Sequence, residues 1–360
     1  MSKEDWLKDC KVFVCDTAGK HSDILIAKAK GRGNSTWEYP KKSYTLKLEK
    51  KEEMLGLPKH KNWVLLANYL DRTLLRNDVA FQVAKCTGLD WTPSGKFAEL
   101  YVNDKHLGNY YFCEQIQVGK NRVNITEMKS EDIDENSITG GYLVELDNNY
   151  DEVNKFKSSI KSLPYMFKSP DDDVIKSEQF LYFQNYVNQL EAALYSDNWL
   201  ETRDYCKYID IESFVDWWLV YEIAKNHEPN HPRSSYMHKD RNGLLKMGPV
   251  WDFDYGGWYG DGWWIKDAIY FDRLFQDPEF VKLVKSKWSE YKPRFDEIPQ
   301  YIYHQSVKIK KSNDTNIKMW PILYNNNGDA ELSFKEAIER LSDVYAKRIE
   351  WLDVEINKLN

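Results

Sequence analysis

The sequence contains no long apolar run. No stretch approaches the roughly 18 consecutive apolar residues of a membrane-spanning helix, so we expect no transmembrane segment. The first residues, MSKEDWLKDCKVFV, also lack the apolar centre of a signal peptide. The sequence therefore leaves two locations open: the cell interior, or the cell surface or exterior after removal of a leader.

Cysteine is scarce and irregularly spaced. The chain has five cysteines, Cys10, Cys15, Cys86, Cys113 and Cys206. Their odd number argues against a complete disulfide framework, and none of their spacings is that of a metal-binding motif. We therefore expect reduced thiols.

Positive charge is not in excess. The chain has 50 Lys and Arg residues against 57 Asp and Glu residues, which gives a formal net charge of −7. A mildly acidic protein of this kind does not predict nucleic acid or an anionic membrane surface as a partner. Aromatic residues, in contrast, are numerous, with 14 Trp and 24 Tyr. They supply core area but also stack on sugars, so they leave a glycan partner open.

Low-complexity segments, repeats and Pro/Gly-rich linkers are also absent, which favours one compact domain over residues 1–360. Residues 1–150 are mostly typical of strands. KKSYTLKLEK alternates polar and apolar side chains, and FAELYVNDKHLGNYYFCEQI predicts a hairpin that turns at Asn103 and Asp104.

Helical spacing dominates after about Lys176. The apolar positions predict helices at residues 71–88, 177–196, 210–226 and 333–359, the last as one long helix or a helix pair. We therefore expect an α+β fold with a strand-rich N-terminal half and a helix-rich C-terminal half. The change of pattern suggests two lobes, at about residues 1–200 and 201–360.

The stretch NHEPNHPRSSY contains His227, Glu228 and His231 in the H-E-x-x-H spacing of zinc peptidases. A zinc site of that type needs both histidines on one helical face, with the glutamate between them as the base. Pro229 lies inside the motif and Pro232 follows it directly, so two helical turns cannot form there. We interpret the stretch as a polar loop after a helix rather than as a zinc site.

A second acidic segment follows this loop. The loop leads into a hairpin with its turn at residues 240–243, whose far strand ends at Asp252 and Asp254 in GPVWDFD. We expect the hairpin to bring these aspartates to the same edge as Asn226 and Glu228. Such oxygen ligands suit Mg²⁺ with phosphate, or acid–base chemistry. The structural alternative is that Asn and Asp are there because they favour turns.

Several blocks of the sequence resemble the CotH-type spore-coat kinases, which are atypical protein kinases found also in many non-sporulating bacteria. The blocks are GRGNSTW with KKSYTLKL, NWVLLANYLDRTLLRNDVAFQVAK, AELYVNDKHLGNYYFCEQI, GGYLVELD, FKSPDDD, DIESFVDWWLVYEIAKN and SSYMHKDRNGLLKMGPVWDFDYG. They run from about Gly31 to Gly256, and RGNST and GPVWDFD are the most specific. The resemblance implies a reduced, atypical protein-kinase-like bilobal fold. It also implies Mg²⁺-dependent phosphoryl transfer from ATP to Ser or Thr hydroxyls of a protein.

The resemblance also implies roles for the acidic residues. Asp252 would bind Mg²⁺ against the nucleotide phosphates, with Asp254 and Asn226 as further metal ligands. Family members carry an N-x-D pattern after the preceding helix, and its aspartate is the expected base or metal ligand. This chain has NHE there, which assigns that role to Glu228. The additional methylene of glutamate shifts the carboxylate and puts the catalytic rate in question.

Phosphate-binding residues are less clearly marked, because the sequence has neither G-x-G-x-x-G nor a P-loop. Lys168 lies on a strand and Glu191 on the following helix, in the order of the lysine–glutamate pair of ordinary kinases. Lys47 on an alternating strand is a second candidate, and Arg32 with Asn34 in the turn GRGNST is a third. The structural alternatives are a solvated strand lysine and an exposed helical glutamate.

Three tryptophans, Trp258, Trp263 and Trp264, lie in the Gly-rich segment after GPVWDFD. At the position of an activation segment they would form either a mobile wall against the substrate or a packed loop.

Two further functions compete with a kinase. One is a non-catalytic surface or polysaccharide-associated binding module on the same fold, which the tryptophan content and Glu228 favour. The other is a hydrolase that uses Glu228 with Asp252 or Asp254 as a carboxylate pair.

Overall fold

The computed structural model describes residues 1–258 and 260–360. Their chain contacts divide into two compact units. The first unit consists of Met1–Asp78, Pro93–Gln115 and Ile302–Glu339, and the second of Val79–Thr92, Ile116–Tyr301 and Arg340–Asn360. These boundaries differ from a division near residue 200, because each unit combines stretches from both halves of the sequence.

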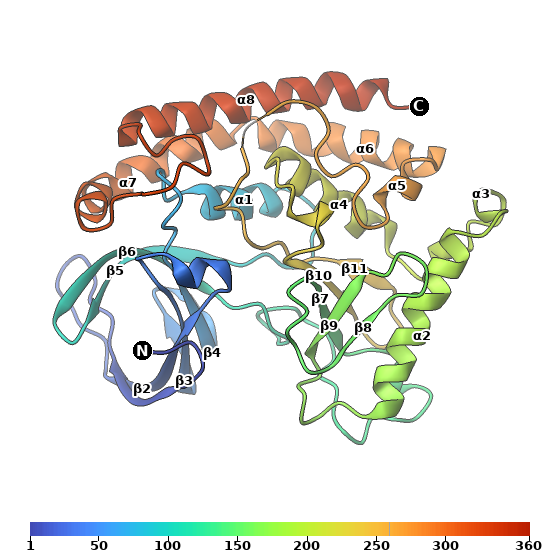
Figure 1. Ribbon diagram of the computed structural model, residues 1–360, viewed down its shortest axis with the longest axis horizontal. Helices are drawn as coiled ribbons and strands as arrows, with labels where there is room; N and C mark the ends of the chain where they lie inside the picture. Colours follow the sequence, from blue (N-terminus) through green and yellow to red (C-terminus); the bar gives the residue numbers. More distant parts are fainter. Residues whose placement is uncertain (259) are drawn as a thin grey trace. The chain divides into compact units, whose positions relative to one another are not determined.

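The first unit contains a six-stranded antiparallel sheet with the strand order β1-β2-β3-β4-β6-β5 (Figure 1). Its strands are β1 (Leu7–Val12), β2 (Leu25–Arg32), β3 (Ser43–Met54), β4 (Leu57–Leu66), β5 (Gly95–Val102) and β6 (Lys105–Glu114). The hairpin expected at Asn103 and Asp104 is confirmed between β5 and β6. Both residues have positive φ, 47° and 62°, as a type I′ turn requires.

One face of this sheet forms an apolar core. Leu46 and Leu48 on β3 are buried and Lys47 between them is exposed, so the expected alternation is confirmed. The core includes Trp63 and Phe112, whose rings stack at 5.0 Å between centroids.

The second unit contains a five-stranded antiparallel sheet with the strand order β11-β10-β7-β9-β8. Its strands are β7 (Tyr142–Leu146), β8 (Lys155–Lys157), β9 (Pro164–Ser169), β10 (Ser235–Lys239) and β11 (Leu245–Met247). The hairpin expected with its turn at residues 240–243 is the pair β10–β11.

Helices form in every range where the sequence predicts them. The α-helices are α1 (Arg76–Lys85), α2 (Ser177–Leu194), α3 (Trp199–Thr202), α4 (Ile211–Ile223), α5 (Phe271–Leu274), α6 (Pro278–Phe295), α7 (Ile298–Met319) and α8 (Phe334–Lys358). Short 3-10 helices are η1 (Ser35–Glu38), η2 (Ser137–Thr139), η3 (Asp204–Lys207) and η4 (Glu228–Asn230). The C-terminal pattern gives one helix, not a pair. Within residues 1–258 and 260–360, no helix is long and apolar enough to cross a membrane.

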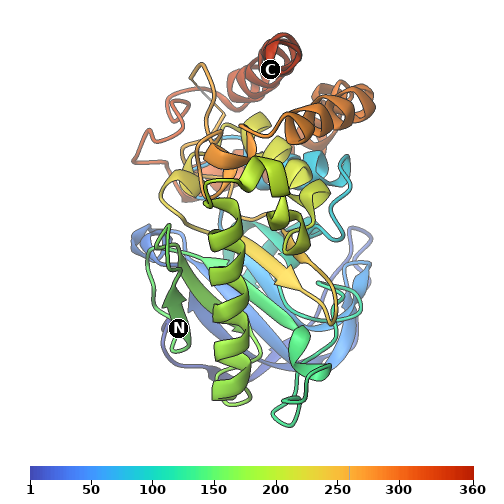
Figure 2. The same cartoon turned by 90° about the vertical axis from the view of Figure 1, so that its right-hand side faces the viewer.

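Helix α2 packs on one face of the five-stranded sheet (Figure 2). Phe183 of α2 contacts Tyr142 at 4.9 Å and Phe167 at 5.6 Å between ring centroids. Successive residues of a strand point to opposite faces, and directly paired residues share a face. Glu145 on β7 is therefore on the other face, together with its partner on β10, Tyr236.

Helix α4 is the buried helix of the second unit. The Asp210 side chain accepts a hydrogen bond from the Ser213 backbone N–H at 3.0 Å, which confirms the cap expected at the start of the helix. All of its residues from Ser213 to Ile223 are buried. A helix that is apolar on most sides belongs in a core, so α4 can hold the loop at its C-terminal end in a fixed position.

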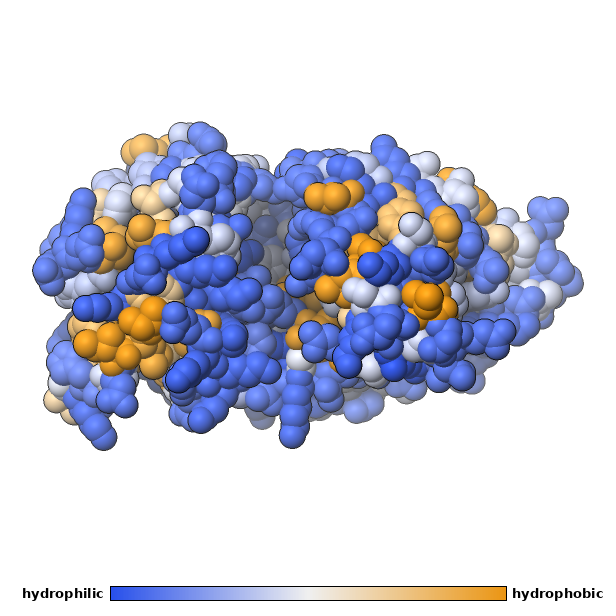
Figure 3. Space-filling model, turned by 90° about the horizontal axis from the view of Figure 1, so that it is seen from below, coloured by the Kyte–Doolittle hydropathy of each residue, from blue (hydrophilic) through white to orange (hydrophobic). Residues whose placement is uncertain are grey.

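Two antiparallel sheets with several helices confirm the α+β class. The face of the molecule in Figure 3 is largely hydrophilic, with apolar residues in separate patches. This fits a chain in which 30% of the residues are charged.

Lys41 is a buried cation in the first unit. Its ammonium group donates hydrogen bonds to the carbonyls of Ala67, at 2.7 Å, and Asn109, and lies 4.5 Å from the centroid of the Tyr110 ring. Burial lowers the pKa of Lys41 from 10.5 to about 7, although the charge of Glu99 opposes the shift.

This shift predicts a stability that depends on pH. Between pH 7 and 10.5 the unfolded chain keeps the Lys41 proton that the folded chain has released, so the free energy of unfolding rises with pH. Relative to Lys41→Met, the free energy of unfolding of the parent should rise by up to about 1 kcal/mol for each pH unit in this range. Urea unfolding at several pH values measures it, with Lys47→Met as the exposed control. Parallel pH profiles for the parent and Lys41→Met would contradict the prediction.

Candidate active site

The loop after α4 carries the first acidic group. Lys225 follows the helix with φ of 50°, and Glu228 begins the short helix η4, with Pro229 next. The backbone N–H of His231 bonds to the carbonyl of Glu228 at 3.0 Å, which closes a single turn. His227 and His231 therefore do not share a face of an α-helix, and the described residues contain no group of three or more His, Cys, Asp or Glu that could hold a metal ion.

Asn226 connects this loop to the second acidic segment. Its side-chain Nδ2 donates to the backbone carbonyl of Asp252 at 2.7 Å, and its Oδ1 accepts from the backbone N–H of Glu228 at 3.0 Å. Asn226 is buried, and Asp252 has φ of 66°, in the left-handed region that residues other than glycine rarely adopt. The structure therefore brings Asn226, Glu228 and Asp252 together, as the sequence predicts.

Glu228 has an ionisable side chain in a crowded acidic environment. Its Oε2 atom is buried and has no hydrogen-bond partner among residues 1–258 and 260–360. Burial, followed by the charge of Asp252, raises the pKa of Glu228 to about 9, and Asp147 and Asp254 add to the effect. Arg233 acts in the opposite direction. The site thus holds more negative than positive charge.

Asp147 is a site residue that the sequence reasoning missed. It follows β7 directly and is buried, with Oδ1 accepting from the Asn149 N–H at 2.7 Å and Oδ2 from the Ser234 N–H at 3.3 Å. Burial raises its pKa, against the effect of those two hydrogen bonds. The available signal was an aspartate at the end of the buried strand GGYLVELD.

Lys168 lies on β9 and pairs with two carboxylates. Its Nζ is 3.5 Å from Oε2 of Glu145 and also bonds to Glu152. Burial by itself lowers the pKa of Lys168, but these two carboxylates raise it above its ordinary value. Glu145 is also one of the charges that raise the pKa of Tyr221 at the end of α4.

The expected pairing of Lys168 with Glu191 is wrong. Glu191 is fully buried, and its carboxylate accepts from the backbone N–H groups of Ile160, at 2.6 Å, and Lys161, at 3.1 Å, and from the Tyr270 hydroxyl at 3.0 Å. It is therefore also not an exposed helical charge. The reason is the side on which α2 packs: it covers the face that carries Tyr142 and Phe167, whereas Lys168, at an irregularity in the β7–β9 register, pairs with Glu145 on the other face.

Arg32, Asn34 and Lys47 belong to the first unit. Arg32 ends β2, and the strand register places it on the same face as Lys47 of β3. Asn34 accepts a hydrogen bond from Nζ of Lys3 at 2.9 Å.

The glycines of GRGNST have local structural reasons. A Cβ atom on Gly31 would lie 2.1 Å from the Trp37 ring, and Gly33 has φ of 106°. A phosphate-binding role for this turn is not needed to explain them and stays a prediction.

The segment after Asp254 packs closely on α4 and α8. The backbone N–H of Trp258 bonds to the Ala224 carbonyl at 2.9 Å. The buried carboxylate of Glu222 accepts from the N–H groups of Trp264, at 2.6 Å, and Ile265, at 3.0 Å. Arg348 pairs with Glu222 at 2.5 Å. These contacts favour a packed loop over a mobile wall.

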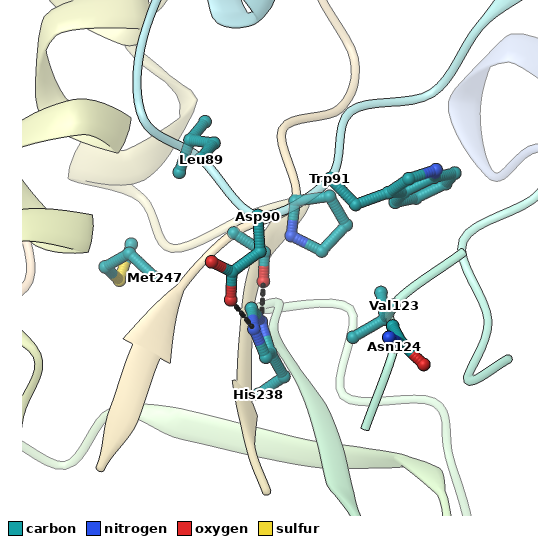
Figure 4. Close-up of a pocket in the computed structure, with 9 residues that line it drawn as sticks. Leu89, Asp90, Trp91, Val123, Asn124, His238 and Met247 are labelled. Carbon is teal, nitrogen blue, oxygen red and sulfur yellow. Dashed lines mark hydrogen bonds and ion pairs between the residues drawn. The ribbon is translucent and has the colours of Figure 1, made fainter. Parts of the chain in front are cut away.

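A cavity of about 330 Å³ lies next to the segment that leads to Asp252 (Figure 4). His238 faces the Asp90 carboxylate there, with its Nε2 at 3.4 Å from Oδ2 of Asp90, and its Nδ1 is 3.1 Å from the Gly248 carbonyl. The hydrogen bond from His238, followed by Lys246, holds the pKa of Asp90 well below its usual range. The walls are formed by Leu89, Asp90, Trp91, Val123, Asn124, His238, Met247, Gly248 and Pro249. His238 thereby fixes one end of the segment.

Comparison with known families agrees with the resemblance seen in the sequence. The family described as CotH kinase protein matches residues 29–352, a range that contains Lys168 and all the acidic residues of the site. No curated protein matches the chain. Because the family match covers nearly the whole sequence, the chain belongs to the CotH kinase protein family.

Proposed function

We propose that the protein is a Mg²⁺-dependent kinase that transfers a phosphoryl group from ATP to Ser or Thr hydroxyls of a protein. The observation that carries the proposal is the excess of carboxylate around the buried Glu228, whose Oε2 atom has no hydrogen-bond partner in the described part of the chain. Buried charges are normally paired or coordinate a metal, so such an excess suits a cation. Family membership supports a kinase-like activity.

The oxygen donors fit Mg²⁺. Magnesium is usually held by one or two carboxylates together with water and substrate phosphates, so it does not require a cluster of three protein ligands. Asp252 and Asp254 would hold the ion, and Asn226 retains a lone pair on the Oδ1 atom that already accepts from Glu228. When bound, Mg²⁺ would offset the charge of the phosphate oxygens.

Glu228 is the proposed base. Without a cation its raised pKa keeps it protonated near neutral pH. A cation held by Asp252 would favour the ionised form of Glu228. The unpartnered Oε2 would then accept the proton of the substrate hydroxyl while the hydroxyl oxygen bonds to the γ-phosphorus of ATP and the bond to the leaving ADP oxygen breaks.

Lys168 is our candidate for the phosphate contact within the second unit. Its ammonium group is held by Glu145 rather than by Glu191, and its raised pKa keeps it charged. Arg32, Asn34 and Lys47 stay candidates in the first unit, where Arg32 and Lys47 share a sheet face.

A non-catalytic binding module remains the alternative proposal, because glutamate occupies the position where the family pattern has aspartate. The tryptophans favour it less than the sequence suggests. Trp258 is buried and Trp263 contacts Trp351 at 5.0 Å, so both are used in internal packing.

Asp252→Ala should weaken Mg²⁺-dependent nucleotide binding. Removing the carboxylate takes away a metal ligand, so the affinity for ATP in millimolar Mg²⁺ should fall by roughly tenfold or more. Isothermal titration calorimetry with and without EDTA measures the change. Asp197→Ala, an exposed aspartate of the same unit, is the control and should bind like the parent. Absence of Mg²⁺-dependent ATP binding by the parent would reject the kinase proposal.

Glu228→Gln should separate binding from chemistry. The amide keeps the shape but cannot accept the hydroxyl proton, so phosphoryl transfer should slow by roughly 100-fold or more while ATP binding changes little. Transfer of labelled phosphate to a Ser/Thr-containing protein, or to the chain itself, provides the rate. Glu228→Asp restores a base and should retain more activity than Glu228→Gln. Equal rates for the parent and Glu228→Gln would exclude Glu228 as the base.

A further inference from the structure

We propose that Tyr221 is a positioning residue that holds Asp252 in the backbone conformation needed to bind the metal. The inference rests on the proposed function, because the metal-binding role of Asp252 is part of it. Tyr221 lies in the last turn of α4 and is fully buried.

The Tyr221 hydroxyl binds both backbone groups of the residue before Asp252. It donates to the Trp251 carbonyl at 3.0 Å and accepts from the Trp251 N–H at 3.2 Å. The Ser234 carbonyl, at 3.3 Å, is a weaker alternative acceptor for the same proton. One side chain thus satisfies the backbone donor and acceptor of Trp251 at once.

The ring of Tyr221 also holds the residue after Asp252. It lies 4.8 Å from the Phe253 ring and stacks on Trp217 at 4.0 Å between centroids. Trp217 is a fully buried residue of the same helix, so the phenol has little freedom to move. Asp252 is therefore fixed on both sides, through Trp251 and through Phe253.

The conformation of Asp252 explains why this support is needed. Asp252 has φ of 66°, in the left-handed region, which aspartate adopts more readily than most residues but which is still less favourable than an ordinary negative φ, so contacts on both sides stabilise it. Rotation of φ to an ordinary negative value would turn the carboxylate away from its present neighbours. Asn226 donates to the Asp252 carbonyl, and Tyr221 binds both backbone groups of the preceding residue, Trp251.

Tyrosine is suited to bind the backbone donor and acceptor of Trp251 together. Its hydroxyl is a donor and an acceptor, whereas phenylalanine has neither group and tryptophan only donates. Burial raises the pKa of Tyr221 well above 10, so the hydroxyl stays protonated at any working pH.

The test compares Tyr221→Phe with Tyr205→Phe. Tyr205 is a second fully buried tyrosine of the same unit, and its hydroxyl bonds to the side chain of Asp277. Both variants lose one buried hydroxyl, so both should show a lower melting temperature. Only Tyr221→Phe should bind Mn²⁺, used as a probe for Mg²⁺, about tenfold more weakly by calorimetry.

Hydrogen exchange gives a second measurement that needs no metal. The Trp251 N–H loses its acceptor in Tyr221→Phe, so residues 248–254 should exchange faster, and Tyr205→Phe should leave them unchanged. Equal Mn²⁺ affinity in the parent and Tyr221→Phe would overturn the inference, as would an equal loss in Tyr205→Phe. If the parent binds no metal, the proposed function fails. If hydrogen exchange of residues 248–254 is also unchanged in Tyr221→Phe, the inferred role of Tyr221 in fixing the backbone of Trp251 is refuted as well.

Discussion

The rest of the site depends on two hydrogen bonds made by the Asn226 side chain. Its amide donates to the main chain of Asp252 and accepts from the main chain of Glu228, so one buried group sets the spacing between two acidic segments far apart in sequence. The carboxyl groups of Glu228 and Asp252 are thereby kept close to each other, and this proximity contributes to the raised pKa of Glu228.

That arrangement is possible because α4 is buried almost throughout. A helix fixed by packing on most sides places its C-terminal loop reproducibly, and three side chains at its end bind other segments. Tyr221 holds Trp251, Glu222 holds the backbone of Trp264 and Ile265, and Asn226 holds Asp252. Arg348 from α8 neutralises Glu222, whose carboxylate would otherwise be an unpaired buried charge. The sequence DIESFVDWWLVYEIAKN thus combines a core helix with the fixing points of the site.

Local features of the sequence were sufficient to predict much of the fold and part of the site. Pro229 and Pro232 exclude two turns of α-helix from the H-E-x-x-H stretch, and the turn at Asn103 and Asp104 follows from residues that accept positive φ. The predicted pairing of Lys168 with Glu191 failed for a different reason. Chain order suggested Glu191 as its partner, but strand pleating and the side on which α2 packs decide which carboxylates it meets. Asp147 and Tyr221 were missed for the same reason, since their roles exist only after β7, β10 and α4 have come together.

The structure also bears on whether the acidic residues are only turn formers. Asn and Asp that serve turns are usually exposed, because water then satisfies their side chains. Here Asn226, Glu228 and Asp147 are buried, and Glu228 has an unpartnered oxygen in the described part of the chain. Asp252 adds an unfavourable backbone conformation to this unfavourable electrostatics. Burial and left-handed backbone conformation in one small region are not what turn formation requires, and they fit our proposal that a bound cation offsets the charge of the site.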